Sequence, residues 1–140
     1  MGIFTVNPEA EVKTGFPVFK PGVYRMRVKE VVDRSADASD PKQDFKVTLE
    51  YADPSQLLLQ DGSPYTGTLD AAGSLFDYVM QDPAKQWKLK ALTLGCGLEW
   101  TDQDFVTSLV GHEVDVKVKI EIYNDEPKNK ADRYVVPVGA

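Results

Sequence analysis

Hydrophobic and polar residues alternate strictly in three segments of the chain. The first, residues 23–29, follows the turn dipeptide Pro21-Gly22; the second covers residues 45–51, and the third and longest covers residues 114–122. A period of two is typical of a β-strand that buries one face and exposes the other. We therefore expect three strands, each with its apolar side chains in a common core.

The rest of the chain predicts two more strands and two helices. The expected elements are a strand within residues 68–80 that reaches Tyr78, a helix from Pro83 to Leu94, a short helix from Thr101 to Gly111, and a last strand over residues 133–138 after a polar turn at residues 124–132. Residues 33–43 have no periodicity and are expected to form a loop.

The longer helix has a clear start and stop in the sequence. Asp82 can cap it and Pro83 can occupy its first position, while the Gly-Cys-Gly sequence at residues 95–97 can end it. The apolar stripes of the two helices predict that Trp87 and Phe105 lie in the core. In the short helix, Thr101 is the expected N-terminal cap.

This order of elements predicts a mainly β domain. Five short strands with a helix between the third and the fourth form the order of an OB-fold-like, five-stranded, partly open barrel. An immunoglobulin-like sandwich would need about seven strands and no long central helix. We expect an N-terminal arm over residues 1–18 and a single OB-fold-like domain over residues 19–140, since 140 residues is a usual length for one domain.

Net charge and hydropathy argue against two classes of protein. The formal net charge of −6 argues against a protein that coats nucleic acid with its whole surface, although a local basic face on an acidic body stays open. No apolar run approaches the roughly 18 residues needed to cross a bilayer, and acidic residues occupy the N-terminus where a signal peptide carries bases. We expect a soluble, cytoplasmic protein.

The sequence contains no recognisable catalytic or metal-binding motif. A phosphate-binding glycine loop is missing, and His112 and Cys96 are the sole histidine and cysteine, which excludes ordinary zinc spacing. Asp102 and Asp104 are explained by the dipole at a helix N-terminus. We expect Cys96 to be structural, His112 to be a surface or capping residue, and the protein to be no enzyme and to use no cofactor or metal.

Basic and aromatic residues on the outward strand faces are the best candidates for function. Arg25, Arg27 and Lys29 share one side of the first strand and Lys46 lies on the second, so pairing of these strands would merge them into one patch. Phe76 and Tyr78, with Tyr65 before them, could stack on the bases of single-stranded DNA. The candidates for DNA contact are Arg25, Arg27, Lys29, Lys46, Tyr65, Phe76, Tyr78, Lys128, Lys130 and Arg133.

Another interpretation of the alternating cations is that they keep an exposed sheet face soluble and discourage aggregation at its edge. The same sheet could also dock another protein. The alternative function is therefore a structural or protein-protein interaction module without nucleic-acid binding. The oligomeric state stays open, including a homo-oligomer.

Four stretches resemble a family of bacteriophage single-stranded DNA-binding proteins with an OB-fold. They are Phe19–Val28, Phe45–Tyr51, Trp87–Gly97 and Leu109–Val118 with the following Glu121-Ile-Tyr-Asn. The resemblance implies binding and protection of single strands during phage DNA replication or recombination, in the cytoplasm of the host cell, together with other replication or recombination proteins. It assigns DNA contact to Arg25, Arg27, Lys46, Phe76 and Tyr78. Many such proteins end in an acidic tail that recruits partners, and this chain ends in Tyr-Val-Val-Pro-Val-Gly-Ala.

Overall fold

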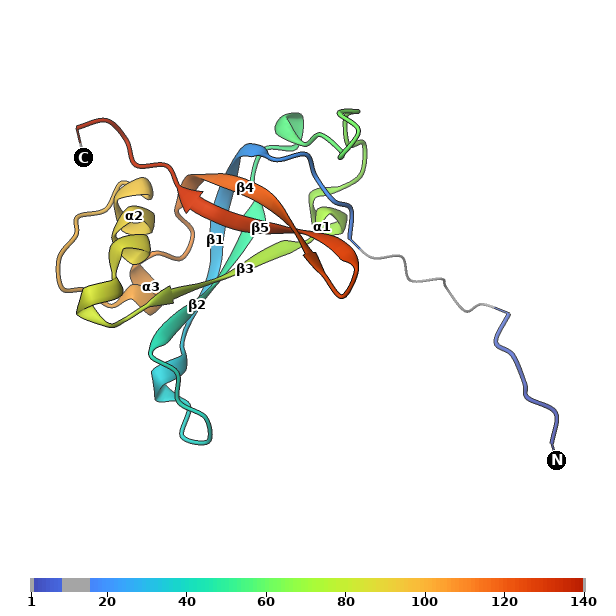
Figure 1. Cartoon of the computed structure of the whole chain (residues 1–140), viewed down its shortest axis with the longest axis horizontal. Coiled ribbons are helices and arrows are strands. Elements are labelled where there is room, and N and C mark those ends of the chain that lie inside the picture. Colours follow the sequence, from blue (N-terminus) through green and yellow to red (C-terminus); the bar gives the residue numbers. More distant parts are fainter. Residues whose placement is uncertain (1, 9–15, 140) are drawn as a thin grey trace.

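A single antiparallel sheet dominates the computed structural model, which describes residues 2–8 and 16–139 (Figure 1). Its strands are β1 (Gly22–Asp33), β2 (Asp44–Tyr51), β3 (Ser74–Met80), β4 (Glu113–Tyr123) and β5 (Glu126–Tyr134). They are ordered β3-β2-β1-β4-β5 across the sheet. The prediction of a mainly β protein with five strands is confirmed for this part of the chain.

The helices are short and few. They are α1 (Leu69–Ala72), α2 (Trp87–Gly95) and α3 (Phe105–Ser108), with 3-10 turns at Arg34–Ala36, Pro54–Gln56 and Pro83–Lys85. Both α2 and α3 come between β3 and β4 in the chain, as expected, and they lie together at one end of the sheet (Figure 1). Over the described ranges, none of these helices has the length and apolar character to cross a bilayer.

The core follows the alternation in the sequence. Met26 and Val28 of β1 are fully buried, and so are Val114 and Val116 of β4, which pair with β1 across the sheet. Their branched or long apolar side chains fill the inner face, and the polar residues between them point outward. Phe19, the first residue of the predicted domain, is also fully buried. Of the predicted arm, residues 1 and 9–15 lie outside the described residues.

The two edge strands of the sheet, β3 and β5, approach each other without forming a barrel. No backbone ladder joins them within the described ranges. Instead, the buried carboxylate of Asp77 on β3 accepts hydrogen bonds from Tyr134 of β5 (2.6 Å) and from Lys88 of α2 (2.9 Å). Burial raises the pKa of Tyr134 well above its ordinary value, so the phenol stays a donor. Side chains therefore hold the open edges together.

The last hairpin differs from the prediction. Its turn consists of Asn124 and Asp125 alone, both with positive φ (51° and 62°), and β5 begins directly after them. The expected polar turn over residues 124–132 and the strand over residues 133–138 are therefore wrong. The polar Asn129 occupies an inward position of β5, where its side chain accepts a hydrogen bond from the Phe19 amide (2.7 Å) and donates one to the Phe19 carbonyl (2.9 Å). A polar inward residue hides the strand from a hydrophobicity pattern.

Two predictions about the helices are also wrong. Trp87 is 67% exposed, because α2 starts only at Trp87 after a 3-10 turn and buries Leu89 and Leu92. In α3, the cap is Asp104, which accepts a hydrogen bond from the Val106 amide, and Thr101 lies outside the helix. Asp82 caps the 3-10 turn that precedes α2. The apolar stripe predicted for the longer helix therefore has the wrong helical phase.

Candidate nucleic-acid interface

Aromatic side chains and a cation lie together on the outer side of β2 and β3. In the register of these strands, Lys46 is opposite Tyr78 and Thr48 is opposite Phe76. Phe76 is 52% exposed and Tyr78 is 44% exposed, while the neighbours on the inner side are buried. We call the surface formed by Lys46, Thr48, Phe76, Tyr78 and Met80 the β2–β3 face.

Each exposed ring of the β2–β3 face has a cation over it. The Lys46 ammonium lies 4.5 Å from the centroid of the Phe76 ring, and the Arg34 guanidinium carbon lies 4.4 Å from the centroid of the Tyr78 ring. Such contacts place positive charge beside a flat apolar surface. This combination suits a single-stranded nucleic acid, which offers a phosphate and an unpaired base at each nucleotide.

Arg34 is held in place by a buried carboxylate. Asp44 accepts two hydrogen bonds from it, from Nε and from Nη2, each 2.6 Å long. This bond raises the pKa of Arg34 above its ordinary value. Arg34 directly follows the last residue of β1, and Asp44 is the first residue of β2. The ion pair therefore links the two ends of the loop that connects these strands.

Arg25 and Arg27 lie on the outer side of β1, as predicted, but each has acidic partners. Arg25 contacts Glu113 (3.3 Å) and Asp115 (3.4 Å) on β4. Arg27 contacts Glu113 (3.2 Å) and Glu50 (3.5 Å). Two cations are therefore matched by three carboxylates in this network, which leaves little net positive charge for a phosphate backbone.

The expected continuous basic patch does not form. Arg27 pairs across the sheet with Glu50, and Lys46 pairs with Val32 at the other end of the same ladder. Four residues of an extended strand separate Glu50 from Lys46, roughly 13 Å at about 3.3 Å per residue. Lys29 falls at an irregularity of the ladder between Val28 and Glu30 and is exposed. The prediction that the two strands are neighbours leaves their register open, and the register decides which end of β2 lies opposite the arginines.

Tyr65 packs against the hydrophobic core and does not face outward with Phe76 and Tyr78. Its ring packs edge-on against the buried Phe19, with 5.3 Å between the ring centroids, and its hydroxyl donates a hydrogen bond to the Thr68 carbonyl. These contacts use both the ring and the polar group of Tyr65. The side chain is therefore not part of the β2–β3 face.

The basic cluster of β5 lies at the other edge of the sheet order from β3. Lys128 lies 5.3 Å from the ring centroid of Tyr123, and Lys130 contacts the carboxylate of Glu121 at 3.4 Å. Arg133 is exposed and is opposite Lys117 of β4. The structure thus divides the predicted residues among the β2–β3 face, the arginine network of β1 and the outer side of β5.

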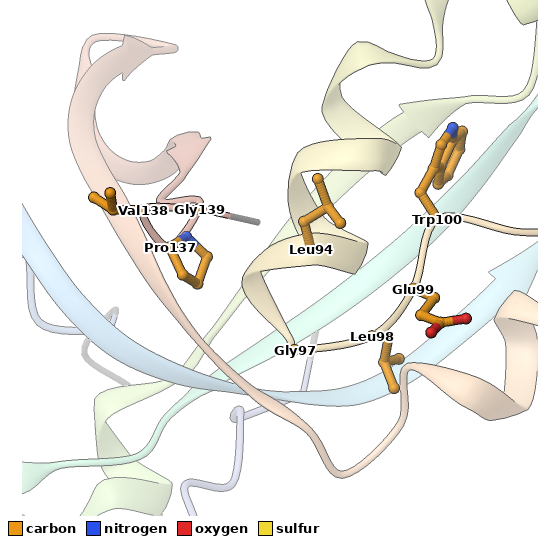
Figure 2. Close-up of a pocket in the computed structure, with 8 residues that line it drawn as sticks. All are labelled: Leu94, Gly97, Leu98, Glu99, Trp100, Pro137, Val138 and Gly139. Atoms are coloured by element: carbon orange, nitrogen blue, oxygen red, sulfur yellow. The ribbon is translucent and has the colours of Figure 1, made fainter.

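A shallow hollow of about 570 Å³ lies between α2, the chain that follows it and the C-terminal segment (Figure 2). Its lining is mostly apolar, and among the described residues that form it Glu99 alone is titratable. The lining residues are Leu94, Gly97, Leu98, Glu99, Trp100, Pro137, Val138 and Gly139. None of the residues predicted to bind DNA contributes to it, and its lining supplies no set of groups for chemistry.

Cys96 and His112 occupy the places expected for structural residues. Cys96 is buried, and His112 is exposed directly before the first residue of β4. Within the described ranges, no group of three histidine, cysteine, aspartate or glutamate residues is arranged to hold a metal ion.

Burial raises the pKa of the Cys96 thiol to about 11. Compared with a thiol at its ordinary pKa, the thiolate fraction at pH 8 is then about 100-fold lower. We expect iodoacetamide to label native Cys96 at pH 8 at least about 100-fold more slowly than the urea-unfolded chain, as measured by mass spectrometry. Equal labelling rates in the two states would contradict the buried position.

Two sequence comparisons find no relative. No protein-family model matches the chain, and a search of curated proteins returns no match. The function must therefore be inferred from the geometry of the β2–β3 face.

Proposed function

We propose that the protein is a non-enzymatic, phage-encoded binder of single-stranded DNA that protects single strands during replication or recombination. Bases stack on Phe76 and Tyr78, and Lys46 contacts the phosphates. One observation carries this proposal: two neighbouring aromatic rings are about half exposed on one side of β3, each with a cation within 4.5 Å of its centroid.

The proposal includes an OB-fold-like architecture. The strand order β3-β2-β1-β4-β5, with α2 and α3 inserted between β3 and β4, supports it. The contact between Asp77 and Tyr134 brings the edge strands together, as a barrel requires. In such a barrel the outer side of the second and third strands is a common surface for oligonucleotides, and here that surface is the β2–β3 face.

Stacking should supply most of the binding free energy. Each stacked base contributes about 1 to 3 kcal/mol, and every base has a π-face, so the preference for sequence should be weak. The electrostatic contribution should be small, because Glu30 and Glu50 adjoin the face on β1 and β2. A protein with a net charge of −6 can bind DNA in this way without a large basic surface.

The test is a titration of fluorescently labelled oligo-dT at two salt concentrations, followed by anisotropy. We expect binding that weakens with salt, with a slope of log K against log salt of about −0.7 to −1.4, as for one or two phosphate contacts. Absence of binding at low salt would contradict the proposal. It would favour the protein-protein interaction module.

Two variants test whether Lys46 or the arginines of β1 contact the phosphates. Replacing Lys46 with Gln should weaken oligo-dT binding about threefold to tenfold and make the salt slope shallower by about 0.7, since one phosphate contact is lost. The control, Arg25→Gln with Arg27→Gln, should change the affinity less than about threefold, because this network adjoins Glu50, roughly 13 Å along β2 from Lys46 and beyond the Debye length of about 10 Å at 0.1 M salt. A larger loss in the double variant than in the Lys46 variant would place the DNA over β1.

A further inference from the structure

The guanidinium of Arg34 is fixed on two sides. Asp44 holds the edge that carries Nε and Nη2, and the ring of Tyr78 covers one face. The side chain nevertheless remains 32% exposed. The opposite face of the guanidinium plane and Nη1 are therefore the parts left for other contacts.

The segment that carries Arg34 is also anchored. Asp33, the residue before it, accepts hydrogen bonds from the backbone and hydroxyl of Ser35 and from the side-chain amide of Gln81. The same Gln81 amide donates to the Asp44 carbonyl. These bonds connect β1, β2 and the chain after β3, so the guanidinium is positioned before any ligand arrives.

We propose that Arg34 is a base-stacking position of its own at the end of the β2–β3 face. A nucleobase stacks on the free side of the guanidinium, whose other side lies over the Tyr78 ring, and Asp44 is the positioning residue that holds the guanidinium there. Guanidinium planes are established stacking surfaces for unpaired bases. This inference rests on the proposed function and adds a residue that the sequence pattern had placed in a loop.

Arg34 and Lys46 then have different tasks. Within the described residues Lys46 has no carboxylate partner, and its flexible ammonium can leave the Phe76 ring and follow a phosphate. Arg34 cannot do so without breaking two hydrogen bonds to a buried acid. Its charge is largely compensated by Asp44, and what it offers a ligand is a flat surface. Its contribution should therefore depend little on salt.

The test compares Arg34→Lys with the wild-type chain in oligo-dT titrations at two salt concentrations. Lysine keeps the charge and loses the plane, so we expect binding about tenfold weaker at both concentrations with an unchanged salt slope, a loss within the range of one stacked base. Affinity within twofold of wild type would overturn the inference.

Asp44→Asn tests the positioning role and provides a second variant if the first fails to fold. Its amide has nearly the same shape, but one of the two carboxylate oxygens becomes an NH2 donor, so it cannot accept from Nε and Nη2 with one oxygen each. We expect about the same loss as in Arg34→Lys, and no further loss when both changes are combined, with thermal unfolding as the control for folding. Additive losses would overturn the positioning role. If the wild-type chain does not bind oligo-dT at all, the proposed function fails first, and that result is distinct from these outcomes.

Discussion

Replacing Phe76 and Tyr78 together with alanine is expected to weaken oligo-dT binding by at least about 30-fold. Each ring supports one stacked base worth about 1 to 3 kcal/mol, so losing both costs about 2 kcal/mol or more, and 1.4 kcal/mol corresponds to tenfold in affinity. The rings lie on the outer side of β3 and are about half exposed. We therefore expect a smaller change in folding stability than in binding.

The matched control is Trp87→Ala. This side chain is a larger and more exposed aromatic, and it lies on α2, outside the sheet. Its removal should leave the affinity within about twofold of wild type, as measured in the same anisotropy titration. Equal losses in the two variants would mean that the effect comes from general surface hydrophobicity and not from the β2–β3 face.

Replacing Asp77 with alanine is expected to destabilise the fold by about 3 to 5 kcal/mol. The change leaves the partly buried Lys88 ammonium without its carboxylate and removes the acceptor of the Tyr134 hydroxyl. Breaking a buried ion pair by removing one partner has a cost of about this size. Because Asp77 and Tyr134 also connect the edge strands, urea unfolding should show a lower midpoint and native-state exchange should show weaker protection in β3 and β5.

Asp115→Ala provides the comparison for the Asp77 variant. Asp115 also pairs with a cation, Arg25, at 3.4 Å, but both side chains are about two-fifths exposed. An exposed pair is worth about 0 to 1 kcal/mol. An Asp77 variant that loses no more stability than the Asp115 variant would contradict the role of Asp77 as the connection between β3 and β5.

The alternation of side chains was enough to predict β1, β2 and β4. In these strands nearly every inward position is apolar, as Met26, Val28 and Val114 illustrate. β5 was missed because Asn129 points inward and binds the backbone of Phe19, a residue 110 positions away. A local pattern contains no information about that partner, so the strand looked like a polar turn.

Side-chain alternation also predicts part of the candidate site. Phe76, Tyr78 and Lys46 follow from the alternation on β2 and β3, because outward positions on paired strands become neighbours. The acidic partners of Arg25 depend on the pairing of β1 with β4, which the sequence did not specify. Arg34 was missed because it follows the end of β1, and only its contacts with Asp44 and Tyr78 give it a fixed direction.

Photocrosslinking tests the central claim most directly. Oligo-dT carrying 5-iodouracil is irradiated with the wild-type chain, and the attached peptides are identified by mass spectrometry. The proposed site predicts that the crosslinks concentrate on Phe76 and Tyr78 of β3. Crosslinks confined to β5 or to the outer side of β1, with β3 unmodified, would show that bases do not stack where the exposed rings lie.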